Sequence, residues 1–279
     1  MQKKTQVRES VIAGWWYPGQ PDALRETIDG FLSHVESQPI AGELIGLIAP
    51  HAGYAFSGQT AAYAYQQVAG RSYDVVAIVS PMHRMPMGRL AVTSAAAYKT
   101  PLGSVKLDEE LVEALAKEVN LDRVDRDEEH SLEIQLPFLQ ATLGDFGLLP
   151  VMIGTSSFEA GEELGMALAG VLRGRQALMV ASTDLHHIEN YDEVVRRDVA
   201  VVDAIASFDM TRVKEVLSPW DCSVCGRIPV YAVLTAAGAL GANKVEILHH
   251  TNSGDVTGNR MPGQYTVGYL AAAIYREEE

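Results

Sequence analysis

The chain has 279 residues, of which 47% are hydrophobic and 21% are charged, so it can bury a large core and is not a disordered or low-complexity protein. Its 36 aspartates and glutamates outnumber 22 lysines and arginines, and the net charge of −14 disfavours binding to nucleic acid or to an anionic membrane. The two cysteines are too few for a disulfide scaffold and indicate a reducing compartment.

Short apolar runs alternate with helical stretches along the chain. In chain order, the pattern predicts a strand at 44–49, a helix at 58–68, strands at 74–80 and 90–94, a helix at 108–119, a strand at 148–153, a helix at 158–172, a strand at 177–181, helices at 191–207, 210–217 and 230–240, and strands at 245–249 and 265–274. Continuously apolar strands separated by helices are typical of a mainly parallel sheet covered on both faces, which is a three-layer α/β/α architecture.

The chain shows no internal repeat, no linker and no shift in composition, so we expect one domain over residues 1–279. The polar N-terminal residues lack an apolar signal segment, and the longest apolar run, 228–240, is shorter than the roughly 20 residues that span a bilayer. We therefore expect a cytoplasmic protein that does not enter the membrane.

Histidines follow three predicted strands at the point where each strand ends. His51 follows the first of these strands, His83 follows the second, and Asp184, His186 and His187 follow the third. Ligands of open α/β sheets bind outside the carboxyl ends of the strands, and neutral imidazole is a common ligand of transition metals. A single histidine of this kind is more often a hydrogen-bonded core or loop residue, but His51 and His83 together favour a metal site.

The segment DEEHSLEIQLPF spaces His130 and Glu133 so that they would share one face of a helix, with Pro137 kinking or starting it. The alternative is a helix start at which the acidic residues 127–129 serve as capping charges, and spacing alone favours that alternative. The aromatic cluster at residues 13–17 lines either a pocket mouth or, more commonly for such clusters, the core.

Cys222 and Cys225 form a lone C-x-x-C motif that does not open a helix directly after a predicted strand. Three interpretations remain open: a redox pair, two buried structural thiols, or one thiolate that binds the same metal as the histidines. The fingerprints of phosphate-binding loops, dinucleotide-binding folds and serine hydrolases are missing from the sequence.

Several motifs in a fixed order resemble the Memo family, whose microbial members are called AmmeMemoRadiSam system protein B. The motifs are APHAGYAFSG, SPMHR, DEEHSLEIQLPFL, STDLHH and CGRIPV, and the resemblance covers nearly the whole chain. It implies a fold similar to that of class III extradiol ring-cleaving dioxygenases, in which an α/β sheet encloses a mononuclear non-haem iron site.

Carried onto this sequence, the resemblance implies metal ligands at His51, His83 and Cys225. It implies catalytic roles for the following residues: His187 as an acid or base, Asp184 as its partner, and His130 with Glu133 as a pocket wall or proton relay. Arg84 stands where members of the family carry a second histidine, and Cys225 takes the place of the dioxygenase carboxylate, which argues against ring cleavage.

The resemblance implies iron, with copper or zinc as alternatives because a thiolate donor is softer than a carboxylate. Oxidation of a small substrate is the first expected function. The second is a non-enzymatic module that binds a metal, a peptide or a partner, working with a radical SAM protein and an AMMECR-type partner protein. The third is zinc-assisted hydrolysis, in which a fourth coordination position holds water.

Overall fold

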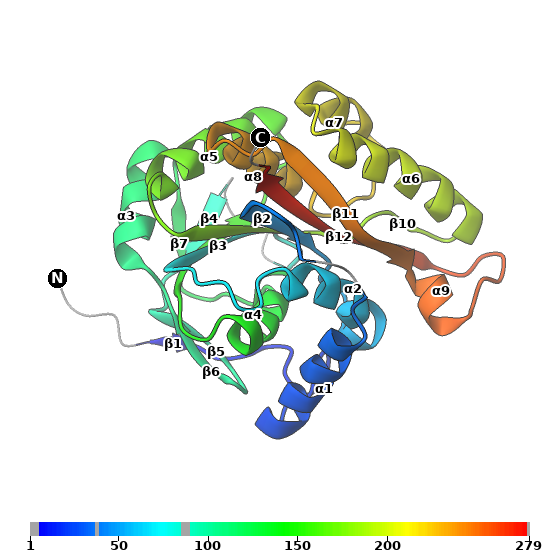
Figure 1. Cartoon of the computed structure of the whole chain (residues 1–279), viewed down its shortest axis with the longest axis horizontal. Helices are drawn as coiled ribbons and strands as arrows, with labels where there is room; N and C mark the ends of the chain where they lie inside the picture. The colour runs from blue at the N-terminus through cyan, green and yellow to red at the C-terminus, as the bar shows by residue number, and fades with distance from the viewer. Residues whose placement is uncertain (1–5, 37–38, 85–89, 278–279) are drawn as a thin grey trace.

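The structure is a computed structural model, and it describes residues 6–36, 39–84 and 90–277. A large central sheet lies between two layers of helices, and a small sheet packs beside it (Figure 1). The strands of the central sheet are β2 (Glu43–Ala49), β3 (Val75–Pro81), β4 (Leu90–Thr93), β7 (Asp122–Val124), β8 (Gly147–Ile153), β9 (Ala177–Ser182), β10 (His187–Ile188), β11 (Lys244–Asn252) and β12 (Thr266–Arg276). The small sheet contains β1 (Val7–Arg8), β5 (Ala97–Thr100) and β6 (Gly103–Lys106).

The central sheet has the order β10-β12-β2-β9-β3-β8-β4-β7, and β11 pairs with β12. The four inner strands β2, β9, β3 and β8 run parallel to one another, whereas β12 and β4 are antiparallel to the inner strands they join. Nearly every residue of these inner strands is buried, as their continuous apolar runs predict. The predicted three-layer α/β fold is thus confirmed; the sheet is parallel at its centre, and the pairings of β12 with β2 and of β4 with β8 are antiparallel.

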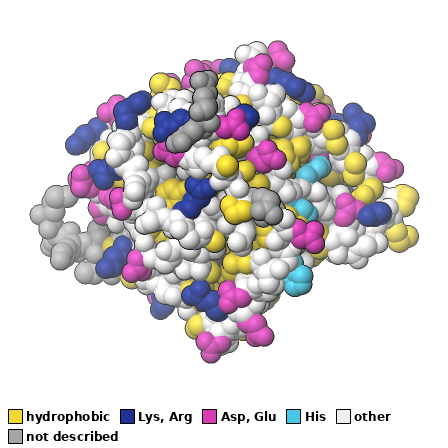
Figure 2. Space-filling view, viewed as in Figure 1, with side chains coloured by type: hydrophobic (Ala, Val, Ile, Leu, Met, Phe, Trp, Pro, Cys, Tyr) yellow, Lys and Arg dark blue, Asp and Glu magenta, His cyan; other side chains and the backbone are white. Residues whose placement is uncertain are grey.

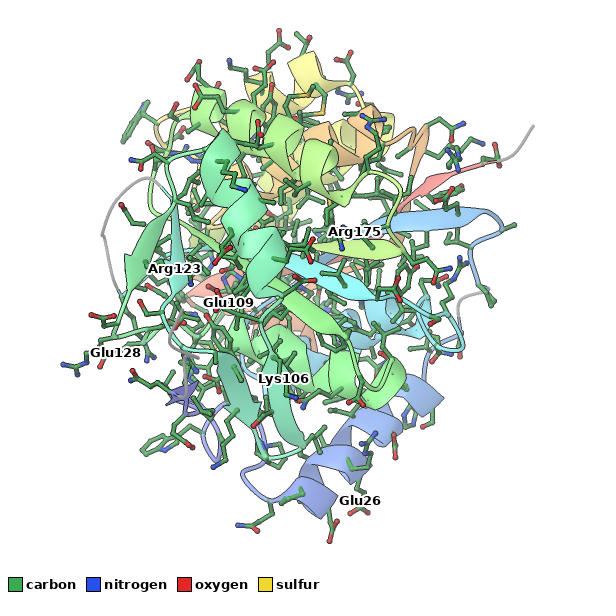
Figure 3. All side chains as sticks on the ribbon, turned by 90° about the vertical axis from the view of Figure 1, so that its left-hand side faces the viewer. Glu26, Lys106, Glu109, Arg123, Glu128 and Arg175 are labelled. Carbon is green, nitrogen blue, oxygen red and sulfur yellow. The ribbon has the colours of Figure 1, made fainter. Side chains whose placement is uncertain are left out.

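Helices cover both faces of the sheet (Figure 1). One layer contains α3 (Glu109–Glu118), α5 (Phe158–Leu172), α6 (Tyr191–Ser207), α7 (Met210–Leu217) and α8 (Arg227–Ala239). The other contains α1 (Pro21–Ser33), α2 (Tyr54–Gln66), α4 (Leu136–Thr142) and the short α9 (Ser253–Thr257). An ion pair joins Glu109, at the start of α3, to Arg123 of β7 at 2.8 Å (Figure 3).

The segment around His130 differs from the helix predicted there. His130 precedes a 3₁₀ turn, Glu133–Gln135, and α4 begins only at Leu136. Pro137 occupies the first turn of α4, where its missing N–H costs no hydrogen bond, so the proline starts this helix and does not kink it. His130 and Glu133 therefore do not share one helical face, and the acidic residues before them do not cap a helix.

On the face shown in Figure 2, basic and acidic side chains are interspersed over the surface. None of the helices in the described part of the chain is long and apolar enough to cross a membrane.

Helices α5 and α8 pack closely because small residues face each other between them. A methyl group added to Gly165 would lie 2.7 Å from the Ala232 carbonyl oxygen and 2.7 Å from Thr235 Cβ, whereas one added to Gly170, in the same helix, would meet nothing within 4 Å. Gly165→Ala should therefore destabilise the protein by about 1–3 kcal/mol through overpacking. Gly170→Ala should stabilise it by about 0.5–1 kcal/mol, because alanine loses less backbone entropy in a helix.

Denaturant unfolding of both variants measures these free energies. The same sign of change for both substitutions would contradict the close contact between α5 and α8.

Candidate metal centre

The ends of three neighbouring parallel strands bring the predicted site residues together. His51 follows β2, His83 follows β3 and Asp184 follows β9, and these strands are adjacent in the sheet. Their carboxyl ends meet at one edge, as expected for a ligand site of an open α/β sheet. His130 reaches the same place from the segment between β7 and α4.

Three histidines form a cluster with metal-binding spacing. One ring nitrogen each of His51, His83 and His130 lies within 4.8 Å of the others, and the ring centroids are 4.9–5.7 Å apart. His130 Nδ1 is buried and has no hydrogen-bond partner among the described residues. An unpartnered imidazole nitrogen among two further imidazoles suits a cation, so the donor set fits a transition-metal ion.

Hydrogen bonds fix which nitrogen of His51 is free. Its Nδ1 lies 2.9 Å from Ser182 Oγ, and that hydroxyl donates its only hydrogen to the Ser131 carbonyl at 2.6 Å. Ser182 Oγ can therefore only accept from His51, so Nδ1 carries the proton and Nε2 presents a lone pair. A partner at the remote nitrogen that orients the ring in this way is typical of metal-binding histidines.

A buried carboxylate holds the loop that carries His83. Glu129 is fully buried and accepts hydrogen bonds from the backbone N–H groups of His83, at 2.9 Å, and of Arg84, at 2.7 Å. The loop after β3 is thereby tied to the segment that contributes His130. Glu129 is thus an anchor of the site and not the capping charge that its sequence context suggests.

The protein environment keeps these imidazoles neutral, which is the form that binds metals. Burial, and then the neighbouring His83 and His130, hold the pKa of His51 well below its usual range. Burial and the nearby His83 and arginine charges lower the pKa of His130 to about 3. Burial likewise lowers the pKa of His83.

Cys225 contacts His51 but lies outside the three-histidine cluster of the described residues. Its Sγ is 3.1 Å from His51 Nε2 and accepts from the Asp184 N–H at 3.2 Å. Burial raises the pKa of this thiol, so without a metal it is protonated and can donate to His51 Nε2. Its predicted role as a ligand would require a metal near His51 to displace that proton.

Asp184 and His187, both predicted to be catalytic, border the cluster. Asp184 accepts from the N–H groups of His51, at 2.8 Å, and Ala52, at 3.3 Å, and burial raises its pKa to about 7. His187 Nδ1 lies 3.2 Å from the Tyr265 hydroxyl, and its Nε2 is buried without a hydrogen-bond partner among the described residues. Burial lowers the pKa of His187 to about 4.

Glu133, also predicted to be catalytic, points away from the cluster. Its carboxylate is fully buried, pairs with Arg8 and accepts from the Tyr17 hydroxyl at 2.6 Å and from the Val11 N–H at 3.0 Å. It does not line the cavity described next. Glu133 therefore fastens the N-terminal segment to the wall of the site, and its predicted catalytic role stays a prediction.

The histidine cluster lies in a cavity of about 600 Å³ that is lined by several aromatic side chains. The side chains that line it include Trp15, Trp16, Phe56, Tyr265 and Tyr269. The Trp16 ring lies 4.3 Å from that of His130, and the Trp16 carbonyl is held by the Tyr54 N–H at 2.8 Å. Trp15 and Trp16 of the aromatic cluster therefore line a pocket, whereas Tyr17 is buried in the core, so both fates considered from sequence occur.

Other residues of the site carry no sequence signal of their role. Ser182, Glu129 and Tyr265 act by contact with the histidines, and their partners are distant in the chain. Ser182 and Glu129 lie within the motifs STDLHH and DEEHSLEIQLPFL, but neither motif indicates these contacts.

Comparison with known proteins shows similarity along the whole chain. The sequence model of the family described as "Memo-like protein" matches residues 8–273. A MEMO1 family protein of Pyrobaculum aerophilum is 35% identical over 282 residues, which cover 97% of this chain and 99% of the relative. MEMO1 family proteins of Methanopyrus kandleri and Thermotoga neapolitana are 34% and 35% identical, each over 96% of this chain and 99% of the relative.

Among solved structures, an uncharacterized protein from Escherichia coli K12 has the same fold. Its TM-score is 0.53 at 16% sequence identity, over 83% of this chain and 99% of that chain.

Proposed function

The chain belongs to the Memo family, and we propose that its histidine cluster binds a redox-active metal ion used to oxidise a small aromatic substrate. The observation that carries the proposal is the set of three neutral imidazoles at the wall of an aromatic cavity. Iron is the proposed metal, with copper as the redox-active alternative, because imidazole donors suit both. Zinc also suits these donors but has no redox chemistry, so it belongs to the third candidate below. When bound, iron supplies one-electron and dioxygen chemistry.

His51, His83 and His130 would hold the ion, and the aromatic side chains would bind and orient the substrate ring. His187 would exchange a proton with a substrate hydroxyl through its unpartnered Nε2, while Tyr265 orients its Nδ1. Asp184 would fix the loop of His51 through the two backbone hydrogen bonds that it accepts.

Metal analysis of protein purified without oxygen tests the first part of this proposal. Wild type should bind about one equivalent of iron, and His83→Ala or His130→Ala should weaken binding by more than about 100-fold, because loss of an outer partner alone costs about 10–100-fold. His34→Ala, which removes an exposed histidine of the segment after α1, is the matched control. Wild-type affinity in His130→Ala would contradict the three-histidine set.

Cys225→Ser distinguishes the two ligand sets. Nearly unchanged affinity supports His51, His83 and His130, whereas a loss as large as that of His83→Ala supports the set of His51, His83 and Cys225 implied by the family. Oxygen uptake by the iron-loaded protein with catechols tests the oxidation. Bound metal without uptake on any phenolic substrate would contradict it.

A second candidate function is the binding of a peptide or partner protein without turnover, in concert with a radical SAM protein and an AMMECR-type protein. The exposed apolar side chains near the cavity favour it, because Trp15 is 91% exposed and Tyr265 is 52% exposed. A zinc-assisted hydrolase is the third candidate, since three imidazoles with a fourth open position match one arrangement of catalytic zinc. Activity with zinc in the absence of oxygen would favour it.

A further inference from the structure

A cysteine, a histidine and an aspartate lie close together outside the histidine cluster. His186 Nδ1 is 2.8 Å from Asp198 Oδ1, and the His186 side chain lines one cavity of about 270 Å³ together with Cys222. Cys222 comes from the loop between α7 and α8, His186 from the segment between β9 and β10, and Asp198 from the middle of α6. The imidazole is therefore held by a carboxylate and shares a cavity with a thiol, which is a combination that can activate a nucleophile.

The carboxylate of this group has little freedom to move. Asp198 is completely buried, and Oδ1 also accepts from the His186 backbone N–H at 3.0 Å. A Cβ atom on Gly268 of β12 would lie 1.8 Å from Asp198 Oδ2, so the strand backbone packs directly against the carboxylate. Asp198 consequently holds the His186 ring in one orientation.

The surroundings of the two thiols differ. Burial raises the pKa of Cys222, but the hydrogen bond with His186, the Val224 N–H and the Arg227 charge outweigh it, so the net pKa is lowered. Burial opposes protonation of His186, but its hydrogen bonds with Asp198 and Cys222 raise its pKa to about 9. Cys225, by contrast, has a raised pKa. Cys222 thus differs from an inert buried thiol.

Cys222 is also accessible from two cavities. It is only partly buried and lines one cavity of about 380 Å³ and another of about 270 Å³. The smaller cavity is also lined by His186 and by Arg196 and Arg197. The larger one is also lined by Cys225, so a group attached to Cys222 there would face a second thiol.

We propose that Cys222 is a nucleophilic thiol that reacts with small disulfides, with His186 as its proton acceptor and Asp198 as a positioning residue. The Cys222 proton passes to His186, and the thiolate attacks one sulfur of the disulfide RS–SR. A bond forms between Cys222 Sγ and that sulfur while the RS–SR bond breaks, and the departing RS⁻ takes up a proton. The second thiol in the same cavity favours disulfide chemistry over acyl transfer.

The two cysteines allow a direct test, because removing one isolates the other. Full-length Cys225→Ser and Cys222→Ser are treated with oxidised glutathione and with iodoacetamide at pH 7, and adducts are followed by intact mass. In Cys225→Ser, Cys222 should react about tenfold faster than N-acetylcysteine, because a lowered pKa increases the thiolate fraction. Cys225, in Cys222→Ser, should react more slowly than N-acetylcysteine.

Adding His186→Gln to Cys225→Ser should slow the reaction by about tenfold and move the midpoint of its pH profile upward. Adding Asp198→Asn should shift the midpoint in the same direction, while adding His34→Gln should change neither rate nor midpoint. Thermal unfolding identifies any variant that fails to fold. If Asp198→Asn fails to fold, the result for His186→Gln decides the test.

A Cys222 that reacts no faster than N-acetylcysteine, or that is unaffected by His186→Gln, would overturn the proposal. Reaction with iodoacetamide but not with oxidised glutathione would overturn the assignment to disulfides.

Discussion

Replacing Glu133 with glutamine should lower the free energy of unfolding by about 3–5 kcal/mol, the range seen when one partner of a buried ion pair is removed. Arg8 is 6% exposed, and the other nearby carboxylate, that of Asp127, lies 3.6 Å from its Nε. The substitution would leave Arg8 buried beside a neutral amide. It would also loosen the segment that carries Tyr17 and, next to it, Trp16 at the cavity wall.

Chemical denaturation of Glu133→Gln and of the control Glu128→Gln measures this effect. Glu128 pairs with Arg126 at the surface and lies at the periphery of the molecule (Figure 3), so its substitution should cost less than about 1 kcal/mol. If Glu133 instead acts in catalysis, Glu133→Gln should reduce turnover with stability unchanged. That result would refute the anchoring role.

The metal-free protein should lose stability steeply in acid because of its buried histidines. The folded-state pKa of His130 is about 3, below the ordinary value of 6.5, owing to burial and nearby charges. Between these values the unfolded chain binds a proton that the folded protein does not, so the free energy of unfolding falls as the pH falls. At about 1.4 kcal/mol per pH unit, His130 alone should cost roughly 3 kcal/mol between pH 6 and 4.

Urea unfolding of wild type and His130→Gln at pH 6 and pH 4 checks this expectation. The variant should lose roughly 3 kcal/mol less between the two pH values, whereas His34→Gln should follow wild type. Asp184 acts in the opposite sense, because burial raises its pKa to about 7, but its contribution cancels when the two proteins are compared. Equal losses in wild type and His130→Gln would contradict a buried, neutral His130.

The inner strands could be predicted from sequence because each is buried on both faces and so appears as an unbroken apolar run. The same runs place His51, His83 and Asp184 at strand ends, and hence at one edge of the sheet. Helix α1 lies outside the predicted elements, because only Leu24 and Ile28 of it are buried and its remaining residues are mostly polar. The strands of the small sheet are too short to show the alternation of apolar and polar residues that indicates a strand.

The position of His130, the third member of the histidine cluster, could not be predicted from spacing along the chain. His130 belongs to an irregular segment, and its position depends on Glu129 and Ser131, whose partners lie at or just after the ends of β3 and β9. From sequence alone, a buried glutamate within a run of acidic residues looks the same as an exposed one. Such contacts join residues about 50 positions apart, so no local pattern encodes them.

The position of β2 in the sheet has a consequence for synthesis of the chain on the ribosome. This early strand, which leads directly to His51, is flanked by β9 and by β12, the last strand of the described residues. Because both neighbours are distant in sequence, one edge of β2 must stay unpaired until β12 has left the ribosome. We therefore expect nascent chains that lack β12 to need protection from aggregation, and the edge that carries the histidine cluster to take shape only after β12 has emerged.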